Sequence, residues 1–295
     1  MNINGQIVSP EAATVSIFDR GFLYGDSVYE VIRTYDGYTF ALEEHLSRLK
    51  RSAQALYIPL SLSEDELKER IFSTLRAAHT EHPSEDLYVR AIITRGVGNL
   101  GFAQSKVQGG NTVVIFTLPL SALGRPADQG ISLWVAEDRI RMPKNALDPA
   151  IKSGNYLNCV LAYLEAQQHG ADDALLCDTQ GNVTEGTTFN IFAIQGSKVL
   201  TPRKEVGILD GITRSLLMQW LREEGLTVEE RDFSRQDLLQ MEELFITGTI
   251  KEVCPVTLLN GTPVGSGSPG PWTQRIRKLY QIRARDHARN TGVHL

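Results

Sequence analysis

Short β-rich runs alternate with amphipathic helical patterns along most of this chain, which restricts the fold to a mixed α/β (α+β) class. The run 29–42 predicts two strands, because the Asp36-Gly37 pair between its halves favours a tight hairpin turn. Apolar residues that recur every three or four positions predict a helix over 42–56. Further helices are expected at 63–79 and 211–225, and further strands at 87–96, 111–120 and 131–140.

A polar stretch divides this alternating pattern into two parts. The segment SALGRPADQG, residues 121–130, contains Gly and Pro and has little apolar periodicity, which is typical of a linker. With 295 residues, the chain is long enough for two domains that each have a core. We therefore expect a small N-terminal domain over 1–120 and a larger C-terminal domain over 131–295.

The charge and the apolar pattern exclude several kinds of partner. A formal net charge of −5 gives no indication of a nucleic-acid or anionic-membrane surface. No apolar run approaches the ~18–20 residues of a membrane-spanning helix, and the start MNINGQIVSP lacks the features of a secretory signal. The three cysteines, Cys159, Cys177 and Cys254, lie far apart and are odd in number, so we expect a reducing, cytoplasmic location.

Several common catalytic motifs are absent or misleading. The segment RGVGNLG, residues 95–101, matches the dinucleotide-binding fingerprint, but no helical pattern follows it and no acidic residue lies about 20 positions on. A glycine-rich hairpin loop is the better interpretation. The histidines and cysteines form no recognised metal-binding spacing, so no metal site is expected, and no Gly-x-Ser-x-Gly elbow is present.

Lys152 stands just before an apolar helical pattern, in a short run of small polar residues. The positive end of a helix dipole disfavours a cation, and burial lowers the pKa of a lysine further. A neutral lysine amine is a nucleophile that can form a Schiff base, whereas the ordinary alternative is a solvated lysine. The residues expected to form the buried stripe of the helix are Leu157, Val160, Leu161 and Leu164.

Two charged side chains lie in otherwise apolar patterns. Glu185 lies within the β-rich run NVTEGTTFNIF, and a buried acid there needs a partner such as a protonated pyridine nitrogen. The alternative is an edge-strand carboxylate that faces water. Arg48 lies beside the apolar stripe of its helix, where a partly buried guanidinium can bind a phosphate through two nitrogens. The alternative is an arginine that extends to solvent.

Two further segments suit an anion. Ile212 and Thr213 open a helix after an Asp-Gly turn, so their backbone N–H groups and a hydroxyl can bind phosphate. Thr247, Gly248 and Thr249 end a strand with a turn of small residues, which allows a phosphate to approach the backbone closely. A threonine cap and an ordinary turn are the respective alternatives.

The order and spacing of these segments resemble the class IV (fold-type IV) pyridoxal-phosphate (PLP) aminotransferases. That family includes branched-chain aminotransferases, D-amino-acid aminotransferases and aminodeoxychorismate lyases. The resemblance runs from FDRGFLYGDSVYEVIRTY, residues 18–35, to PVGSGSPGPWTQRI, residues 263–276. It implies a small α/β domain, a larger, mixed β-barrel-like domain that binds PLP, an active site between the domains, and a homodimer or a larger homo-oligomer.

The resemblance also implies the roles of individual residues. Lys152 would bond covalently to PLP and then move the substrate proton, Glu185 would pair with the pyridine nitrogen, and Tyr156 would hydrogen-bond the phenolic oxygen. Leu209 would pack against the ring. The residues expected to hold the phosphate are Arg48, Ile212, Thr213, Gly248 and Thr249.

Within the family, the segment LYVRAIITRGVGNLG is most similar to the branched-chain enzymes. The expected reaction is transamination between a branched-chain L-amino acid and 2-oxoglutarate, without nucleic acid or membrane as a partner. The residues expected to bind substrate are Tyr24, Tyr29, Arg33, Tyr88, Arg90, Thr249 and Ile250.

Other positions keep the identity and stereochemistry of the amino donor open. Leu100 and Phe102 stand where D-amino-acid enzymes carry an arginine and a histidine that bind the substrate carboxylate, which argues against that activity. However, Val31 replaces a glycine usual in bacterial branched-chain enzymes, and the spacing in KSGNY is closer to the D-amino-acid pattern. A D-amino-acid or (R)-amine transaminase is therefore an alternative, and aminodeoxychorismate lyase is a less favoured one.

Overall fold

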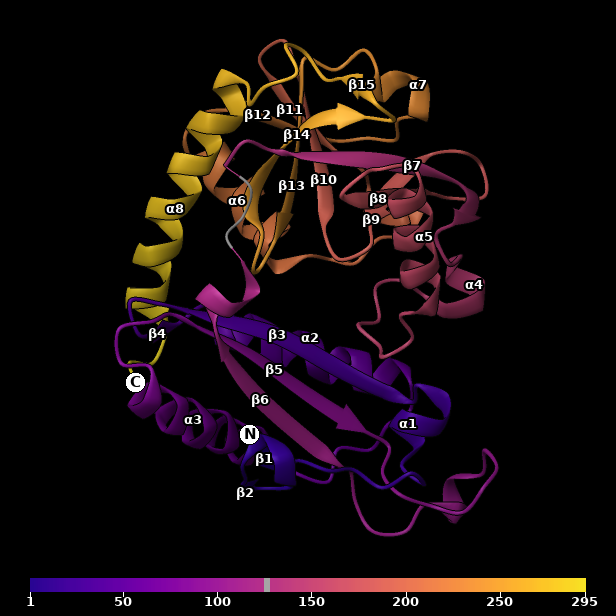
Figure 1. Cartoon of the computed structure of the whole chain (residues 1–295), viewed down its shortest axis with the longest axis vertical. Helices are drawn as coiled ribbons and strands as arrows, with labels where there is room; N and C mark the ends of the chain where they lie inside the picture. The colour runs from indigo at the N-terminus through magenta and orange to yellow at the C-terminus, as the bar shows by residue number, and fades with distance from the viewer. Residues whose placement is uncertain (125–127) are drawn as a thin grey trace. The chain divides into compact units, whose positions relative to one another are not determined.

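The computed structural model describes residues 1–124 and 128–295, which form two compact units (Figure 1). The first unit contains Met1–Gly124 together with Ile151–Asn155 and Arg285–Leu295, and the second contains 128–150 and Tyr156–Ala284. Two segments that the sequence assigns to the C-terminal domain thus belong to the first unit. Part of the expected linker 121–130, namely residues 125–127, lies outside the described residues.

The first unit is built on a six-stranded antiparallel sheet in the order β2-β1-β6-β5-β3-β4. Asp36 and Gly37 join β3 to β4 with φ values of 50° and 81°, and both are positive, as a type I′ hairpin turn requires. The strands are β1 (Asn2–Ile3), β2 (Gln6–Ile7), β3 (Ser27–Tyr35), β4 (Tyr38–Thr39), β5 (Leu87–Thr94) and β6 (Val113–Pro119).

Helices cover the sheet of the first unit and complete its core. Leu46 and Leu49 of α2 and Ile71 of α3 share a buried cluster with Ile32 and Val89 of the strands. These helices form because their apolar residues recur at helical spacing and therefore gather on one face. The α-helices are α1 (Arg20–Tyr24), α2 (Leu42–Ala55) and α3 (Glu64–Glu81), and short 3₁₀ turns lie at Pro10–Ala12, Gln104–Lys106 and Leu120–Leu123.

The second unit contains a nine-stranded mixed sheet in the order β12-β11-β10-β13-β14-β7-β8-β9, with β15 beside β14. β9, at one end of this order, connects directly along the chain to β10, and Gly186 N–H donates to the Phe189 carbonyl at 2.9 Å in that connection. The sheet therefore curls back on itself. Its strands are β7 (Ile131–Ile140), β8 (Asp173–Cys177), β9 (Val183–Gly186), β10 (Asn190–Gln195), β11 (Lys198–Thr201), β12 (Thr227–Glu230), β13 (Glu243–Gly248), β14 (Glu252–Leu259) and β15 (Thr262–Pro263).

The second unit also contains five helices in its described residues, and the last of them continues into residues that belong to the first unit. They are α4 (Lys144–Leu147), α5 (Leu157–Gln168), α6 (Ile212–Glu223), α7 (Arg235–Leu238) and α8 (Pro271–Thr291), with a 3₁₀ turn at Lys204–Val206. In the two described stretches, no helix has the length and the apolar character needed to cross a membrane. The same residues contain no group of His, Cys, Asp and Glu side chains arranged to hold a metal ion.

The buried face of α5 is not the one that the sequence predicts. The small residues Cys159, Ala162 and Ala166 are buried, and the two alanines share a cluster with Ala174 of β8. Small side chains let the helix approach the sheet closely, so they rather than the larger residues form the contact. The predicted stripe was therefore wrong: the exposed apolar residues of α5 include Leu157, Val160, Leu161 and Leu164.

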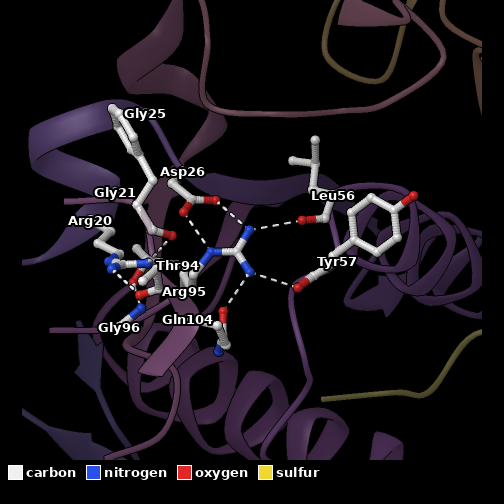
Figure 2. Close-up of polar contacts among 12 residues, drawn as sticks. Arg20, Gly21, Gly25, Asp26, Leu56, Tyr57, Thr94, Arg95, Gly96 and Gln104 are labelled. Carbon is white, nitrogen blue, oxygen red and sulfur yellow. Dashed lines mark hydrogen bonds and ion pairs between the residues drawn. The ribbon is translucent and has the colours of Figure 1, made fainter. Parts of the chain in front are cut away.

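The glycine-rich segment between β5 and β6 forms a loop, as the sequence predicts. Gly98 pairs with Val107, and a Cβ atom at Gly98 would lie 2.4 Å from the Lys106 carbonyl oxygen, so the two sides of the loop approach too closely for a larger residue. Arg95 anchors the start of the loop (Figure 2). Its Nε and Nη2 donate to the Asp26 carboxylate at 2.6 and 3.0 Å, while its Nη atoms also donate to the backbone of 56–57.

Candidate active site

The chain around Lys152 lies beside β3 as a short additional strand. The N–H of Tyr29 donates to the Lys152 carbonyl at 3.1 Å, and the N–H of Gly154 donates to the Ser27 carbonyl at 2.9 Å. The Lys152 N–H donates to the hydroxyl of Ser52, on α2, at 3.1 Å. The small polar residues after Lys152 therefore allow its backbone to pair with a strand, and the position of Lys152 is set by both β3 and α2.

The side chain of Lys152 lies near the ring of Tyr29, which also contacts the guanidinium of Arg90. Its Nζ lies 4.5 Å from the centroid of the buried Tyr29 ring, and the guanidinium carbon of Arg90 lies 4.1 Å from the same centroid. The Nε atom of Arg90 is buried and has no hydrogen-bond partner among the described residues. Burial raises the pKa of the neighbouring Tyr88 hydroxyl, against the opposing effect of the Arg90 charge, so Tyr88 stays protonated and can donate.

The strand around Lys152 leaves no room for a side chain at position 154. A Cβ atom on Gly154 would lie 2.2 Å from the Ser27 Oγ atom. We expect Gly154→Ala to lower the free energy of unfolding by about 1–3 kcal/mol, because the added methyl group forces this pairing apart. Thermal unfolding would measure the loss. Ser27→Ala combined with Gly154→Ala removes the clash and should recover most of the stability, and an unchanged single variant would contradict this packing.

Glu30, His45 and Arg48 form a buried cluster between β3 and α2. Arg48 donates through Nε to Oε1 and through Nη2 to Oε2 of Glu30, both at 2.7 Å. His45 Nδ1 lies 2.7 Å from the same Oε2. Glu30 and His45 are 0% exposed, so water does not screen these contacts. The guanidinium that the sequence assigns to a phosphate is thus held in place by a carboxylate.

The protonation states of this cluster follow from its geometry. Burial acts to raise the pKa of Glu30, but the Arg48 charge and the hydrogen bonds from Arg48 and His45 outweigh it and lower the pKa to about 2. Burial lowers the pKa of His45, which favours a neutral ring. A neutral ring with its hydrogen on Nδ1 satisfies Glu30 and leaves Nε2 as an acceptor, and that atom is buried without a partner in the described part of the chain.

The lowered pKa of Glu30 predicts a contribution to stability that depends on pH. The contribution is fully present above the ordinary glutamate pKa of 4.5 and is lost as the pH falls toward about 2. It should amount to on the order of 3 kcal/mol, so Glu30→Gln should unfold with a flatter pH dependence over this range. Urea unfolding between about pH 2 and 6 would show the difference. The surface variant Glu43→Gln should keep the wild-type slope, and equal slopes for wild type and Glu30→Gln would contradict the assignment.

Glu185, on β9, is buried at 4% exposure and accepts hydrogen bonds from two side chains and one backbone group. Its Oε1 accepts from Nε of Arg141 at 2.9 Å and lies 2.8 Å from Nη2 of the same side chain in an ion pair. Its Oε2 accepts from the Leu209 N–H at 3.0 Å and from the Asn190 amide at 3.2 Å. Burial acts to lower the pKa of Arg141, but the Glu185 charge raises it. The carboxylate that the sequence assigns to a pyridine nitrogen is therefore held in place from both of its oxygens.

The N-terminus of α6 provides backbone donors beside Asn190. Gly211 is the N-cap residue and supplies no capping side chain, and a Cβ atom there would lie 2.0 Å from Asn190 Oδ1. The hydroxyl of Thr213, in the first turn, is buried and has no partner among the described residues. The same is true of Thr247, which pairs with Asn190 across β10 and β13. Two buried hydroxyls without a partner among the described residues, and a helix N-terminus whose N-cap residue supplies no side chain, fit a bound phosphate.

The turn after β13 is anchored by an ion pair. Lys251 Nζ lies 2.7 Å from Oδ2 of the buried Asp173 and 4.6 Å from the Phe189 ring centroid. Thr249 and Ile250, which the sequence assigns to ligand binding, are partly exposed in this turn. The turn is therefore fixed at its end while these two residues remain accessible.

Tyr156 occupies the N-cap position of α5 and is half-buried. Burial raises the pKa of its hydroxyl, and the nearby Cys159 and Glu185 raise it further. Tyr156 therefore keeps its proton and can act as a hydrogen-bond donor.

Tyr24 and Arg33 lie apart from the Tyr29–Lys152 contact. The Tyr24 hydroxyl accepts from the Gly101 N–H at 3.2 Å, and its ring lies 5.2 Å from that of Phe102. Arg33 lies 3.8 Å from the carboxylate of Asp86. The predicted site residues of the first unit are Tyr24, Tyr29, Arg33, Arg48, Tyr88, Arg90 and Lys152, and those of the second are Tyr156, Glu185, Leu209, Ile212, Thr213, Gly248, Thr249 and Ile250.

Several residues of these clusters were missed at the sequence level. Glu30 gave the same signal as Glu185, an acid inside an apolar run, and His45 lies three positions before Arg48 on one helix face. Arg141 and Asn190 gave no such signal, because their contacts with Glu185 depend on the fold.

Comparison with known proteins places this chain in a family. Residues 27–259 match the family described as amino-transferase class IV. A putative branched-chain-amino-acid aminotransferase of Methanocaldococcus jannaschii is 39% identical over 280 residues, which cover 95% of this chain and 94% of that protein. A D-alanine aminotransferase of Bacillus licheniformis is 36% identical over 282 residues, with 94% of each chain covered.

The fold agrees with this relationship. The solved structure of a branched-chain amino acid aminotransferase from Thermobaculum terrenum, in its PLP form, is 30% identical and has a TM-score of 0.85 over 99% of this chain and 96% of that one. The partly buried Lys152, the buried Glu185 carboxylate and the unpartnered Thr213 hydroxyl at α6 are all consistent with PLP as the cofactor. The chain therefore belongs to the class IV aminotransferases and is a PLP-dependent aminotransferase.

Proposed function

We propose that this protein transfers an amino group between a branched-chain L-amino acid and 2-oxoglutarate, with a 2-oxo acid and glutamate as products. The observation that supports this most is the Tyr29 ring with Lys152 at 4.5 Å and Arg90 at 4.1 Å from its centroid. This arrangement combines a reactive amine, an apolar aromatic surface and a cation that can bind a carboxylate. The branched-chain names among the relatives support the same substrate class.

The proposed roles follow from the chemistry of the side chains. When bound, PLP supplies a ring that accepts electrons as the substrate Cα–H bond breaks. Lys152 would hold the cofactor through its Nζ, and the same atom would take the proton from the substrate Cα. Glu185 provides the negative charge for the pyridine nitrogen, and Tyr156 donates to the phenolic oxygen. Leu209, whose backbone N–H donates to Glu185, would pack against the ring.

The remaining residues would hold the phosphate and the substrate. We assign the phosphate to the guanidinium of Arg48 and to the helix N-terminus at Ile212 and Thr213, where a buried hydroxyl has no partner in the described residues. Gly248 and Thr249 would add close backbone and hydroxyl contacts. The proposed substrate-binding residues are Tyr24, Tyr29, Arg33, Tyr88, Arg90, Thr249 and Ile250.

A D-amino-acid or (R)-amine transaminase is the second candidate, favoured by the similarity to a D-alanine aminotransferase. Leu100 and Phe102 argue against it, because both are apolar and exposed and neither can bind a carboxylate. Aminodeoxychorismate lyase shares the lysine and the cofactor, and release of pyruvate from aminodeoxychorismate would support it.

A half-reaction panel tests the proposed substrate class. The PLP-loaded protein is mixed separately with L-leucine, L-glutamate, D-alanine and (R)-1-phenylethylamine, and conversion of the cofactor absorbance to the pyridoxamine form is followed. L-leucine and L-glutamate should react fast because an apolar ring and a cation receive their side chains, and D-alanine should react slowly. Faster conversion by D-alanine would overturn the substrate assignment and leave the family assignment in place.

We further propose a homodimer or a larger homo-oligomer in the cytoplasm. Phe22 and Phe102 are 69% and 85% exposed, and their segments are joined because Arg20 donates to the Gly101 carbonyl at 2.8 Å. Large exposed aromatic side chains on two linked segments are typical of an interface. Sedimentation equilibrium should give at least twice the mass of one chain, and a monomer would contradict the proposal.

Three free, buried cysteines fit a reducing compartment.

A further inference from the structure

The strand β3 and the helix α2 together hold both Lys152 and Arg48, the arginine assigned to the phosphate. β3 contacts Lys152 through the Tyr29 N–H, and the next residue, Glu30, binds Arg48. α2 carries Arg48 and, one turn later, Ser52, whose hydroxyl accepts from the Lys152 N–H. The position of the guanidinium relative to the lysine backbone is thus set by Glu30 and the α2 face that contacts it.

We propose that Glu30 and His45 are positioning residues: Glu30 holds the Arg48 guanidinium in the orientation that binds the cofactor phosphate, and His45 holds the Glu30 carboxylate. This inference rests on the proposed function, in which Arg48 binds that phosphate. Neither Glu30 nor His45 is assigned a contact with substrate or cofactor.

The geometry supports orientation as their role. A guanidinium is planar, and two bonds of 2.7 Å from Nε and Nη2 to one carboxylate set the direction of its plane. The third bond, between His45 Nδ1 and Oε2, restrains rotation of that carboxylate. All three residues are at most 5% exposed, so water cannot replace a missing partner.

The charge of Glu30 and its orienting role predict opposite effects of its removal on phosphate binding. Glu30 carries a negative charge next to Arg48, so its removal would strengthen the attraction of the site for an anion if charge were its only contribution. If Glu30 instead orients Arg48, its removal lets the guanidinium turn away and weakens anion binding. The sign of the change in affinity therefore separates the two roles.

The test compares three probes that bind the full chain. The dissociation constants of PLP, pyridoxal and inorganic phosphate are measured for wild type, Glu30→Gln and Arg48→Met, with fluorescence for the first two and calorimetry for phosphate. We expect Glu30→Gln to raise the dissociation constants of PLP and phosphate about tenfold, since the loss of a two-bond contact releases the Arg48 guanidinium. Pyridoxal has no phosphate group, so its affinity should stay within about twofold.

Two further variants separate positioning from general damage. Asp26→Asn is the matched control, because Asp26 binds Arg95 through the same two nitrogens and does not contact Arg48 (Figure 2), and it should change none of the three affinities. His45→Asn keeps an amide donor near the Nδ1 position and should bind PLP like wild type, whereas His45→Leu should weaken PLP and leave pyridoxal unchanged. The His45 pair keeps the test informative if Glu30→Gln does not fold.

Each outcome either supports or overturns the inference. Tighter phosphate binding by Glu30→Gln, or equal weakening of PLP and pyridoxal, overturns it. If Arg48→Met weakens PLP binding but Glu30→Gln and His45→Leu do not, the positioning role of Glu30 and His45 fails and the role of Arg48 stands. If Arg48→Met leaves PLP affinity unchanged, the assignment of Arg48 in the proposed function fails, and the inference fails with it.

Discussion

Replacement of Lys152 by alanine is expected to lower the rate of transamination by at least about 10⁴-fold, because it removes the amine proposed both to bond to the cofactor and to move the substrate proton. The neighbouring packing should persist, since Lys152 is held through backbone bonds to Tyr29 and Ser52 that an alanine can also make. Single-turnover assays with L-leucine would measure the loss. Added methylamine should restore part of the rate by supplying an external base.

The location of the covalent bond can be established independently. Borohydride reduction of the loaded protein followed by peptide mapping should place the label on the fragment that contains residue 152. Lys50→Ala, at an exposed position on α2, is the control and should retain the wild-type rate and label. A label elsewhere, or an active Lys152→Ala variant, would refute the assignment of this lysine.

Glu185→Gln is expected to impair both stability and catalysis. Four nitrogen groups that can donate a hydrogen bond lie against the Glu185 carboxylate: two nitrogens of Arg141, the Leu209 N–H and the Asn190 amide. A glutamine presents an NH₂ group in place of one oxygen, so buried donors lose their acceptor and the Arg141 charge loses its partner. The free energy of unfolding should fall by about 3 kcal/mol or more. Turnover should fall on the order of 10³-fold, because the proposed charge for the pyridine nitrogen is lost.

Chemical denaturation and single-turnover kinetics on the same preparation would measure these two effects. The control is Glu223→Gln, an exposed carboxylate paired with Arg283, which should change the stability by no more than about 0.5 kcal/mol. Wild-type turnover in a folded Glu185→Gln variant would show that this carboxylate has no part in the chemistry. A loss of stability without a loss of turnover would restrict Glu185 to a structural role.

Local patterns predicted most elements of the fold. The Asp36-Gly37 turn, the helix over 42–56 and the glycine-rich loop before β6 were all predicted from residues that are neighbours in sequence. The buried face of α5 was not predicted, because apolar residues lie on both sides of that helix. Only the position of the sheet determines which side is buried. The small residues Ala162 and Ala166 pack against the sheet, and Leu157 remains 70% exposed.

In the candidate site, too, some features were predicted from the sequence and others depend on the fold. The sequence by itself predicted Lys152 and Glu185 as site residues and identified the class IV family, because an amine before a helix, an acid in an apolar run and ordered motifs are properties of the chain. Only the tertiary structure showed that Lys152 pairs with β3, that Glu30 binds Arg48 and that Arg141 binds Glu185. These partners lie between 18 and 123 residues apart, and no local periodicity relates them. Burial makes each of these charges require a partner, but the folding of distant segments decides which partner it has.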